Sequence, residues 1–179
     1  MKKVLSLLFV FLVLVSCEED PFNAFLKKEN FGPLPRDIGI GYIGSVDFIF
    51  KVTDAQGNNL FDESTPGNWL SKSFSATFEG KEFLWPDDQY DWIEAYILAH
   101  PLPMGFFRNN SFLFFGRLDE EKTWNTDLCI SWPDGSKDRI RVQHAFRWTK
   151  EGNTESYTGF KVNGVPVEGD IIHLTKKKS

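Results

Sequence analysis

The sequence predicts an all-β domain, an antiparallel β-sandwich of about eight strands, on three observations. From residue 45 onward, apolar and polar residues alternate repeatedly with the period of two that is typical of strands. Clusters of glycine, asparagine and aspartate separate these runs, as expected of turns. No ten-residue window combines a convincing helical spacing of apolar residues with capping signals. A closed β-barrel is the competing architecture, because strand patterning alone does not distinguish the two.

Three strands are predicted in the first half of the domain. Residues 46–53 form the first strand, and residues 54–59 form a turn. Residues 74–78 and 82–85 form a hairpin, with Gly80-Lys81 as a type II′ connection because that turn places glycine first. The apolar residues assigned to the core face are Val46, Phe48, Phe50 and Val52 in the first strand and Phe74, Ala76 and Phe78 in the second.

The second half of the domain contains three longer strand patterns. Residues 112–118 are apolar on both faces, which indicates a central strand covered on two sides. Residues 126–132 form a strand that ends at the turn signal Pro133-Asp134-Gly135. Residues 139–148 form the longest alternating run. Its apolar face carries Ile140, Val142, His144, Phe146 and Trp148, and its other face carries Arg139, Arg141, Gln143, Ala145 and Arg147.

The last two predicted strands are residues 157–162 and residues 171–175, and Asn163-Gly164 supplies a type I′ turn after the first of them. Residues 88–100 form either one short helix or a strand. Eight short strands with turns between them favour an immunoglobulin-like or related sandwich over residues 45–179. Prolines and glycines between residues 21 and 44 favour an irregular lead-in to this domain.

The N-terminus carries the pattern of a secretory signal. Lys2 and Lys3 precede an apolar run at residues 4–15. This run is shorter than a membrane-spanning helix, which needs about 20 residues. The run ends in Leu14-Val15-Ser16-Cys17, which resembles a bacterial lipobox. The resemblance implies that residues 1–16 are a lipoprotein signal peptide and that Cys17 carries acyl chains such as palmitate. The alternative is an ordinary signal peptide in which Cys17 is a bystander.

Residues that follow the lipobox point to a location. Glu18, Glu19 and Asp20 resemble the export signal of surface-exposed lipoproteins of Bacteroidetes. The resemblance implies a lipidated tether at residues 17–44 and a place on the cell surface, in the outer leaflet of the outer membrane. The alternative is a solvated acidic spacer in a lipoprotein that faces the periplasm.

The domain itself resembles, at its two ends, small Bacteroidetes lipoproteins of unknown function. The first end is a D-x-x-G-N-x-L turn at residues 54–60, and the second is the Asn163-Gly164 hairpin followed by the apolar strand at residues 171–174. The resemblance brings no catalytic motif with it.

The charge and the cysteine content limit which binding partners and which disulfide bonds can be expected. The 20 Lys and Arg residues against 25 Asp and Glu residues give a net charge of −5, and loss of residues 1–16 makes it −7. Such a chain is not expected to bind nucleic acid, and the lipid on Cys17 rather than charge would hold it to the membrane. If Cys17 is lipidated, Cys129 has no partner within the chain, so no disulfide is expected.

The sequence contains no catalytic or metal-binding motif, and no cofactor is expected. His100, His144 and His173 lie in separate contexts without ligand spacing, and His144 and His173 alternate with core residues. Cys129 lies within a strand pattern, which favours a small strand residue over a nucleophile. The row of Arg139, Arg141 and Arg147 is expected to pair with acids across the sheet.

Acidic and aromatic residues between positions 85 and 96 are the two candidate binding features. Asp87, Asp88 and Asp91 offer oxygen ligands for Ca²⁺, but their spacing does not match the EF-hand loop, so a solvated loop is favoured over a metal site. The rings next to these acids would stack on a sugar face or, as the favoured alternative, cap the core. These rings are Trp85, Tyr90, Trp92 and Tyr96.

These observations predict a lipid-anchored protein of the cell envelope that acts as a non-enzymatic binding or structural component, with a glycan or an envelope protein as partner. The first alternative is a carbohydrate-binding accessory lipoprotein of a glycan-uptake system. The second alternative is a hydrolase whose catalytic residues are dispersed along the chain.

Overall fold

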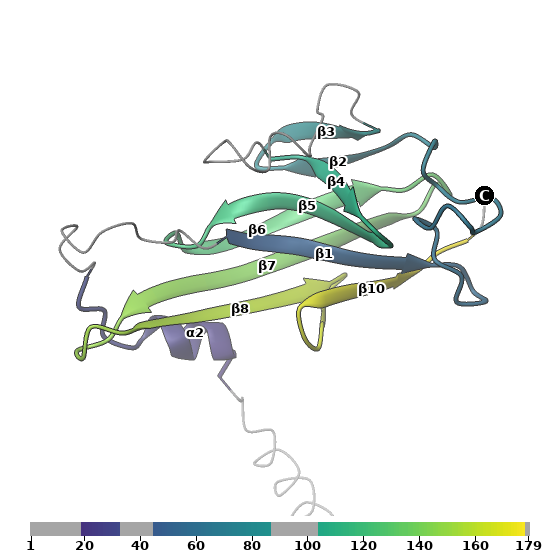
Figure 1. The fold of residues 1–179 in the computed structure, drawn as a ribbon. Coiled ribbons are helices and arrows are strands. Elements are labelled where there is room, and N and C mark those ends of the chain that lie inside the picture. Colours follow the sequence, from purple (N-terminus) through teal and green to yellow (C-terminus); the bar gives the residue numbers. More distant parts are fainter. Residues whose placement is uncertain (1–18, 33–44, 87–103, 178–179) are drawn as a thin grey trace, which may run out of the picture.

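A computed structural model describes residues 19–32, 45–86 and 104–177, and it confirms the β-sandwich (Figure 1). Within these residues, ten strands form two open sheets that face each other. Sheet A has the strand order β10-β1-β5-β4, and sheet B has the order β3-β2-β6-β7-β8-β9. The region at residues 88–100, predicted as a helix or a strand, lies outside the described residues.

Sheet A is built around the first strand of the domain. Strand β1 (Ser45–Thr53) pairs antiparallel with β5 (Phe112–Asp119), and β4 (Phe106–Asn109) extends the sheet beyond β5. On its other side β1 pairs with β10 (Ile171–Thr175), and this pair is parallel. The sandwich is therefore antiparallel, as predicted, except for this one parallel pair among the described strands. The connection from β9 crosses from sheet B, so β10 enters sheet A in the same direction as β1.

Strand β5 is central, as predicted, but only one of its faces is fully covered. Leu113, Phe115 and Leu118 are buried between the sheets. On the other face Phe114 is half-buried and stacks on Phe107 of β4, with 4.8 Å between the ring centroids. On this second face the described ring contact of Phe114 is therefore with a neighbouring strand of the same sheet.

Sheet B contains the hairpins that the sequence predicts. Its strands are β2 (Phe74–Phe78), β3 (Lys81–Trp85), β6 (Trp124–Ser131), β7 (Lys137–Trp148), β8 (Thr154–Val162) and β9 (Val165–Pro166). The Asn163-Gly164 connection has φ angles of 50° and 88°, which confirms the type I′ turn.

The hairpin between β2 and β3 differs from the prediction by one residue. Phe78 pairs with Lys81, so Glu79 and Gly80 are the two loop residues, with φ angles of 48° and 75°. Both angles are positive, which is the type I′ pattern rather than the predicted type II′ turn at Gly80-Lys81. The type I′ turn matches the strand twist and keeps Phe78 on the core face, at the cost of a left-handed conformation at Glu79.

Aromatic rings join the two sheets. Phe48 of β1 contacts Phe160 of β8 and Phe78 of β2, with ring centroids 5.4 Å and 6.0 Å apart. Towards the other end, Phe74 of β2 lies 5.0 Å from Phe106 of β4. Phe48, Phe78 and Phe106 are at most 1% exposed, and Phe74 and Phe160 are 5% exposed. The core is therefore an interlocked set of rings contributed by both sheets.

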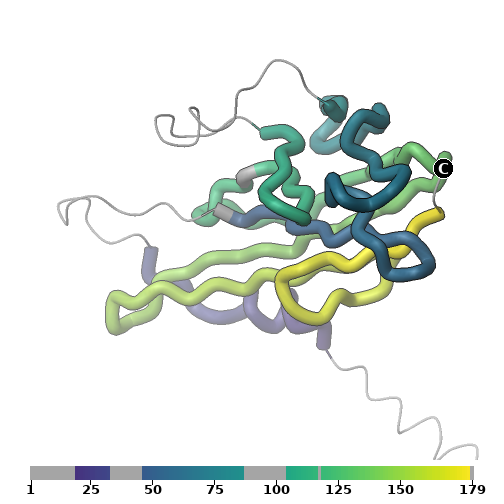
Figure 2. The backbone as a smooth tube through the Cα atoms, turned by 45° about the vertical axis from the view of Figure 1, so that its right-hand side comes forward, coloured from purple at the N-terminus to yellow at the C-terminus, as the bar shows by residue number. Residues whose placement is uncertain are grey.

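The connection between β1 and β2 folds as the predicted turn and then continues as an ordered loop. The Asp54 carboxylate accepts hydrogen bonds from the backbone N–H groups of Gln56 and Asn58, both at 2.9 Å, and Gly57 takes a φ of 85°. The loop then buries Leu60 and Trp69 completely. Figure 2 shows this connection at the same end of the sandwich as the C-terminus.

A buried ion pair ties the C-terminal segment to sheet B. Asp138 of β7 accepts hydrogen bonds from Trp132 Nε1 at 2.7 Å and Asn163 Nδ2 at 2.9 Å. Lys176, which follows β10 of sheet A, lies 2.5 Å from the same carboxylate, and both side chains are less than a tenth exposed. One carboxylate thus connects both layers.

We expect Asp138→Ala to lower the free energy of unfolding by about 3–5 kcal/mol, because it leaves the Lys176 ammonium buried without its counter-charge. Chemical denaturation followed by tryptophan fluorescence measures this loss. The matched control is Glu63→Ala, which removes the exposed partner of Arg108 and should change stability little. Equal losses in the two variants would contradict the structural role of Asp138.

Candidate functional site

The first described residues of the chain are folded against the body. Helix α2 (Pro21–Leu26) begins at Asp20, whose carboxylate accepts a hydrogen bond from the backbone N–H of Phe22 at 3.0 Å. Proline at the first helical position suits a helix start. The prediction of an irregular lead-in is therefore wrong for residues 21–26. We call residues 20–31 the docked segment, and it lies below β7 and β8 in Figure 1.

The docked segment is held by aromatic packing on the outer face of sheet B. Phe22 is 2% exposed, and its ring centroid lies 5.8 Å from that of Tyr157 on β8. Phe25 lies 6.2 Å from the same ring. Gly159 makes room for Tyr157, because a Cβ at this position would lie 2.7 Å from the Tyr157 hydroxyl oxygen. The absence of a side chain at Gly159 thus accommodates the Tyr157 ring, which contacts both rings of α2.

This packing explains why β7 is buried on both faces. The alternation predicted His144 inside and its neighbours Gln143 and Ala145 outside, facing solvent. All three are buried, because α2 covers the outer face of β7 and β8.

Polar contacts attach both ends of the docked segment to sheet B. Asp20 accepts a hydrogen bond from Lys161 Nζ at 2.8 Å. Arg147 donates to the backbone carbonyl of Glu29 at 2.9 Å, and its guanidinium lies 5.5 Å from the centroid of the Phe25 ring. The Asn30 side chain accepts from the backbone N–H of Trp148 at 3.1 Å. The segment is therefore fixed along its length rather than at one point.

Electrostatics favour the docked state above acidic pH. The hydrogen bond from Lys161 is the largest cause that lowers the pKa of the Asp20 carboxyl below its usual value, and the backbone N–H of Phe22 acts in the same direction. The charged carboxylate is thus the form that the docked segment stabilises.

Most candidate site residues of the sequence lie outside the described residues. These are the lipidation candidate Cys17, the weak calcium candidates Asp87, Asp88 and Asp91, and the rings Tyr90, Trp92 and Tyr96; His100 lies outside them as well. Trp85 is described, and its ring packs on Phe74 and Phe61 with 5.9 Å between centroids in each pair. Trp85 therefore forms part of the aromatic core at the end of β3, in agreement with the core-capping alternative.

The histidine and cysteine side chains that are described have different settings. His144 is fully buried, and its ring nitrogens lie 2.8 Å from Thr158 Oγ1 and from the Glu120 carbonyl oxygen. This arrangement confirms a structural histidine. His173 is exposed on β10, and Cys129 is an exposed, free thiol on β6.

The arginine row pairs with acids on neighbouring strands, as predicted. Arg141 donates two hydrogen bonds of 2.8 Å to Asp127 of β6, and Arg139 Nε lies 3.2 Å from the same carboxylate. Arg147 pairs with Glu155 of β8. The Arg141 guanidinium is the main cause that lowers the pKa of Asp127. The row stabilises sheet B rather than presenting free positive charge.

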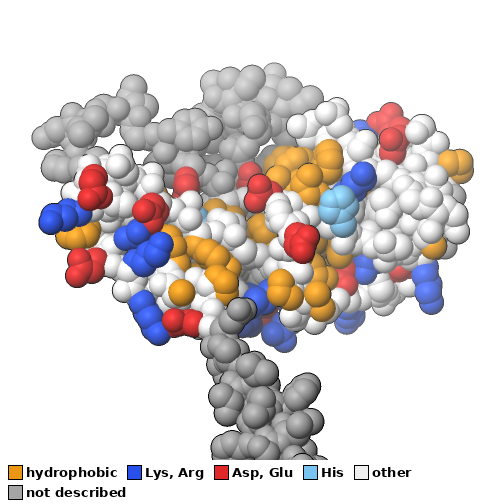
Figure 3. Space-filling model, turned by 90° about the horizontal axis from the view of Figure 1, so that it is seen from below, with side chains coloured by type: hydrophobic (Ala, Val, Ile, Leu, Met, Phe, Trp, Pro, Cys, Tyr) orange, Lys and Arg blue, Asp and Glu red, His pale blue; other side chains and the backbone are white. Residues whose placement is uncertain are grey.

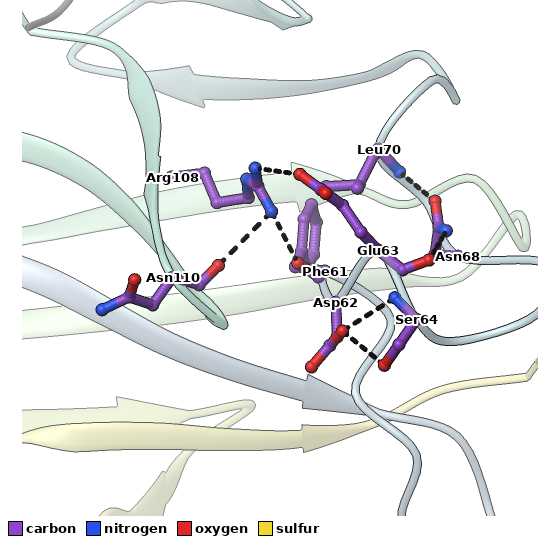
Figure 4. A network of polar contacts seen from close by, with 8 residues as sticks. All are labelled: Phe61, Asp62, Glu63, Ser64, Asn68, Leu70, Arg108 and Asn110. Atoms are coloured by element: carbon purple, nitrogen blue, oxygen red, sulfur yellow. Dashed lines mark hydrogen bonds and ion pairs between the residues drawn. The ribbon is translucent and has the colours of Figure 1, made fainter.

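A second polar network lies where the loop after β1 meets the end of β4 (Figure 4). Arg108 Nη2 lies 2.8 Å from Glu63 Oε1, and Nη1 donates to the Phe61 carbonyl oxygen at 3.4 Å. Asp62 accepts hydrogen bonds from the backbone and side chain of Ser64, which lower the pKa of its carboxyl. The sequence-based search did not single out these residues, because positions 63 and 108 are far apart in the chain. These side chains contact other groups of the same chain, and the contacts hold the loop after β1 against the end of β4.

An open groove of about 470 Å³ lies between β9 and β10, where the edges of the two sheets meet. Its lining is mostly apolar and includes Val165, Val167, Ile171 and His173. Figure 3 views the molecule from below and shows apolar side chains in patches among basic and acidic ones.

No group of three or more potential metal-ligating side chains occurs within residues 19–32, 45–86 and 104–177. In the same described ranges, no helix has the length and apolar character needed to cross a bilayer. Comparisons of the chain with protein-family models, with curated proteins and with solved structures found no match.

We expect Phe22→Ala to detach the docked segment, because truncating a fully buried phenylalanine costs about 3–5 kcal/mol. Trypsin cleavage after Lys27 and Lys28 in the otherwise native protein measures detachment. Leu26→Ala is the matched control, because Leu26 lies on the same helix and is 48% exposed. Cleavage that is equally slow in both variants would show that Phe22 does not hold the segment.

We expect Asp20→Asn to loosen the docked segment at pH 7 by less than about 1 kcal/mol, because asparagine keeps the helix cap but loses the partly exposed ion pair with Lys161. The native pKa of Asp20 is lowered, so the stabilisation is present above its usual pKa and is lost as pH falls through the native value. Amide hydrogen exchange of α2, corrected for intrinsic rates, should therefore separate variant from wild type at pH 7 and not at pH 2. A difference that persists unchanged at pH 2 would contradict the charge effect.

Proposed function

We propose that this protein is a lipid-anchored component of the bacterial cell envelope and acts there as a non-enzymatic binding or structural protein. The observation that carries the proposal is the Leu14-Val15-Ser16-Cys17 lipobox after a basic flank and an apolar run. Cleavage before Cys17 removes residues 1–16 and leaves Cys17 as the acylated first residue.

The described contacts near the N-terminus are compatible with this processing site. Glu19 pairs with Lys27, and Asp20 pairs with Lys161. Both residues lie downstream of Cys17, so a cut before Cys17 leaves these described contacts in place.

The described polar groups support a structural or binding role rather than catalysis. His144 is engaged by Thr158 and Glu120, and Asp138 is engaged by Trp132, Asn163 and Lys176. These groups stabilise the sandwich, and the function would then reside on its surface. Envelope proteins or glycans are the partners that such a location offers.

We expect Cys17→Ser to abolish lipid modification, because serine lacks the thiolate that accepts the acyl-bearing group. Cells grown with labelled palmitate should incorporate label into the wild-type protein and into Cys129→Ser, but not into Cys17→Ser. Mass spectrometry should find that the wild-type chain begins at residue 17 with acyl mass added. Absence of label from the wild-type chain, or its retention in Cys17→Ser, would overturn the proposal.

We propose the outer face of the outer membrane as the location, on the acidic run at residues 18–20. Protease added to intact cells should then degrade the protein, while a periplasmic control protein stays intact. Complete protection of the protein would place it on the periplasmic face instead.

A further inference from the structure

We propose that the docked segment orients the body on the membrane, so that the side of sheet B that α2 covers is turned towards the lipid bilayer. This inference rests on the proposed function, because it takes Cys17 as the residue that bears the lipid. The inference assigns one side of the body to the membrane. Without docking, the body would move freely at the end of a flexible tether.

The length of chain between the lipid and the body carries the argument. Asp20 is the third residue after Cys17, so their Cα atoms lie at most about 11 Å apart. Asp20 is fixed to the body through Lys161 and through the first turn of α2. If all of residues 17–44 formed a flexible tether, its root-mean-square length would be about 30 Å. Docking of α2 therefore removes most of the freedom that a tether of this sequence length provides.

The surface of the docked segment suits contact with lipid. Leu26 is 48% exposed and Phe31 is 53% exposed, and they are two of four large apolar side chains exposed to this degree among the described residues. Lys27 and Lys28 are also exposed, but they pair with Glu19 and Glu155. Apolar side chains flanked by lysine stems are typical of the membrane interface. Because the lysines are paired, contact should not require anionic lipid.

The opposite side of the molecule is directed away from the bilayer in this arrangement. Figures 1 and 2 show α2 on one side of the sandwich and the β2–β3 hairpin on the other. Strand β3 is the edge of sheet B, and its Leu84 is 61% exposed. This edge would be the part of sheet B that is presented to partners.

Fluorescence quenching on vesicles tests the orientation. The lipidated chain, in a Cys129→Ser background, is inserted from detergent into preformed phosphatidylcholine vesicles whose headgroups carry a nitroxide quencher. A fluorophore is attached either at Glu151→Cys or at Leu84→Cys. Glu151 is exposed in the turn that follows Trp148, the residue that binds the end of the docked segment, whereas Leu84 lies on β3. We expect strong quenching at position 151 and little or none at position 84.

The same experiment with Phe22→Ala tests the cause, with Asn23→Ala as the matched control, because Asn23 lies on the same helix and is exposed. Phe22→Ala should still float with the vesicles but lose the contrast between the two label positions, because the body then moves on a longer tether. Asn23→Ala should keep the contrast. Equal quenching at both positions in the floating parent protein, or a contrast that survives Phe22→Ala, would overturn the orientation. Failure of the parent protein to float would instead refute lipidation and the proposed function.

Discussion

The aromatic layer between the two sheets is the constraint on which the rest of the structure depends. Phe48 touches rings from β2, β5 and β8, so a single residue of β1 connects the centre of sheet A to three other strands. Flat rings packed edge to face leave little freedom in the spacing and rotation of the sheets. The outer face of β7 and β8, where α2 rests, keeps its shape because this layer fixes the two strands from beneath.

The docked segment depends on that rigidity. A six-residue helix is too short to be stable alone in water, so α2 exists because sheet B offers it Tyr157, Lys161 and Arg147. The structure also gives Asp20 a role beyond the export signal that the acidic run resembles. It is both the helix cap and the partner of Lys161, so this acid contributes to the fold.

Local patterns predicted the strands well, because alternation and turn chemistry are written within a few residues. The Asn163-Gly164 turn and the buried face of β7 through Ile140, Val142 and His144 follow from such patterns. Two features that depend on a distant partner in the chain were not predicted. The parallel pairing of β10 with β1 depends on where the chain crosses between sheets. The docking of α2 depends on a bare position at Gly159, although Asp20-Pro21 is a recognisable helix start and Phe22 and Phe25 share one helical face. The candidate site therefore had a local signal that was outweighed by the prolines and glycines around it.

The pairing of the first strand with the last has a consequence for how the chain is made. One edge of β1 finds its partner only at Ile171–Thr175, a few residues before the C-terminus. While synthesis proceeds, that edge is left with unsatisfied backbone donors and acceptors, and the chain cannot complete sheet A. Because β10 is the last of the described strands to be made, the two sheets reach their full strand pairing only late in synthesis.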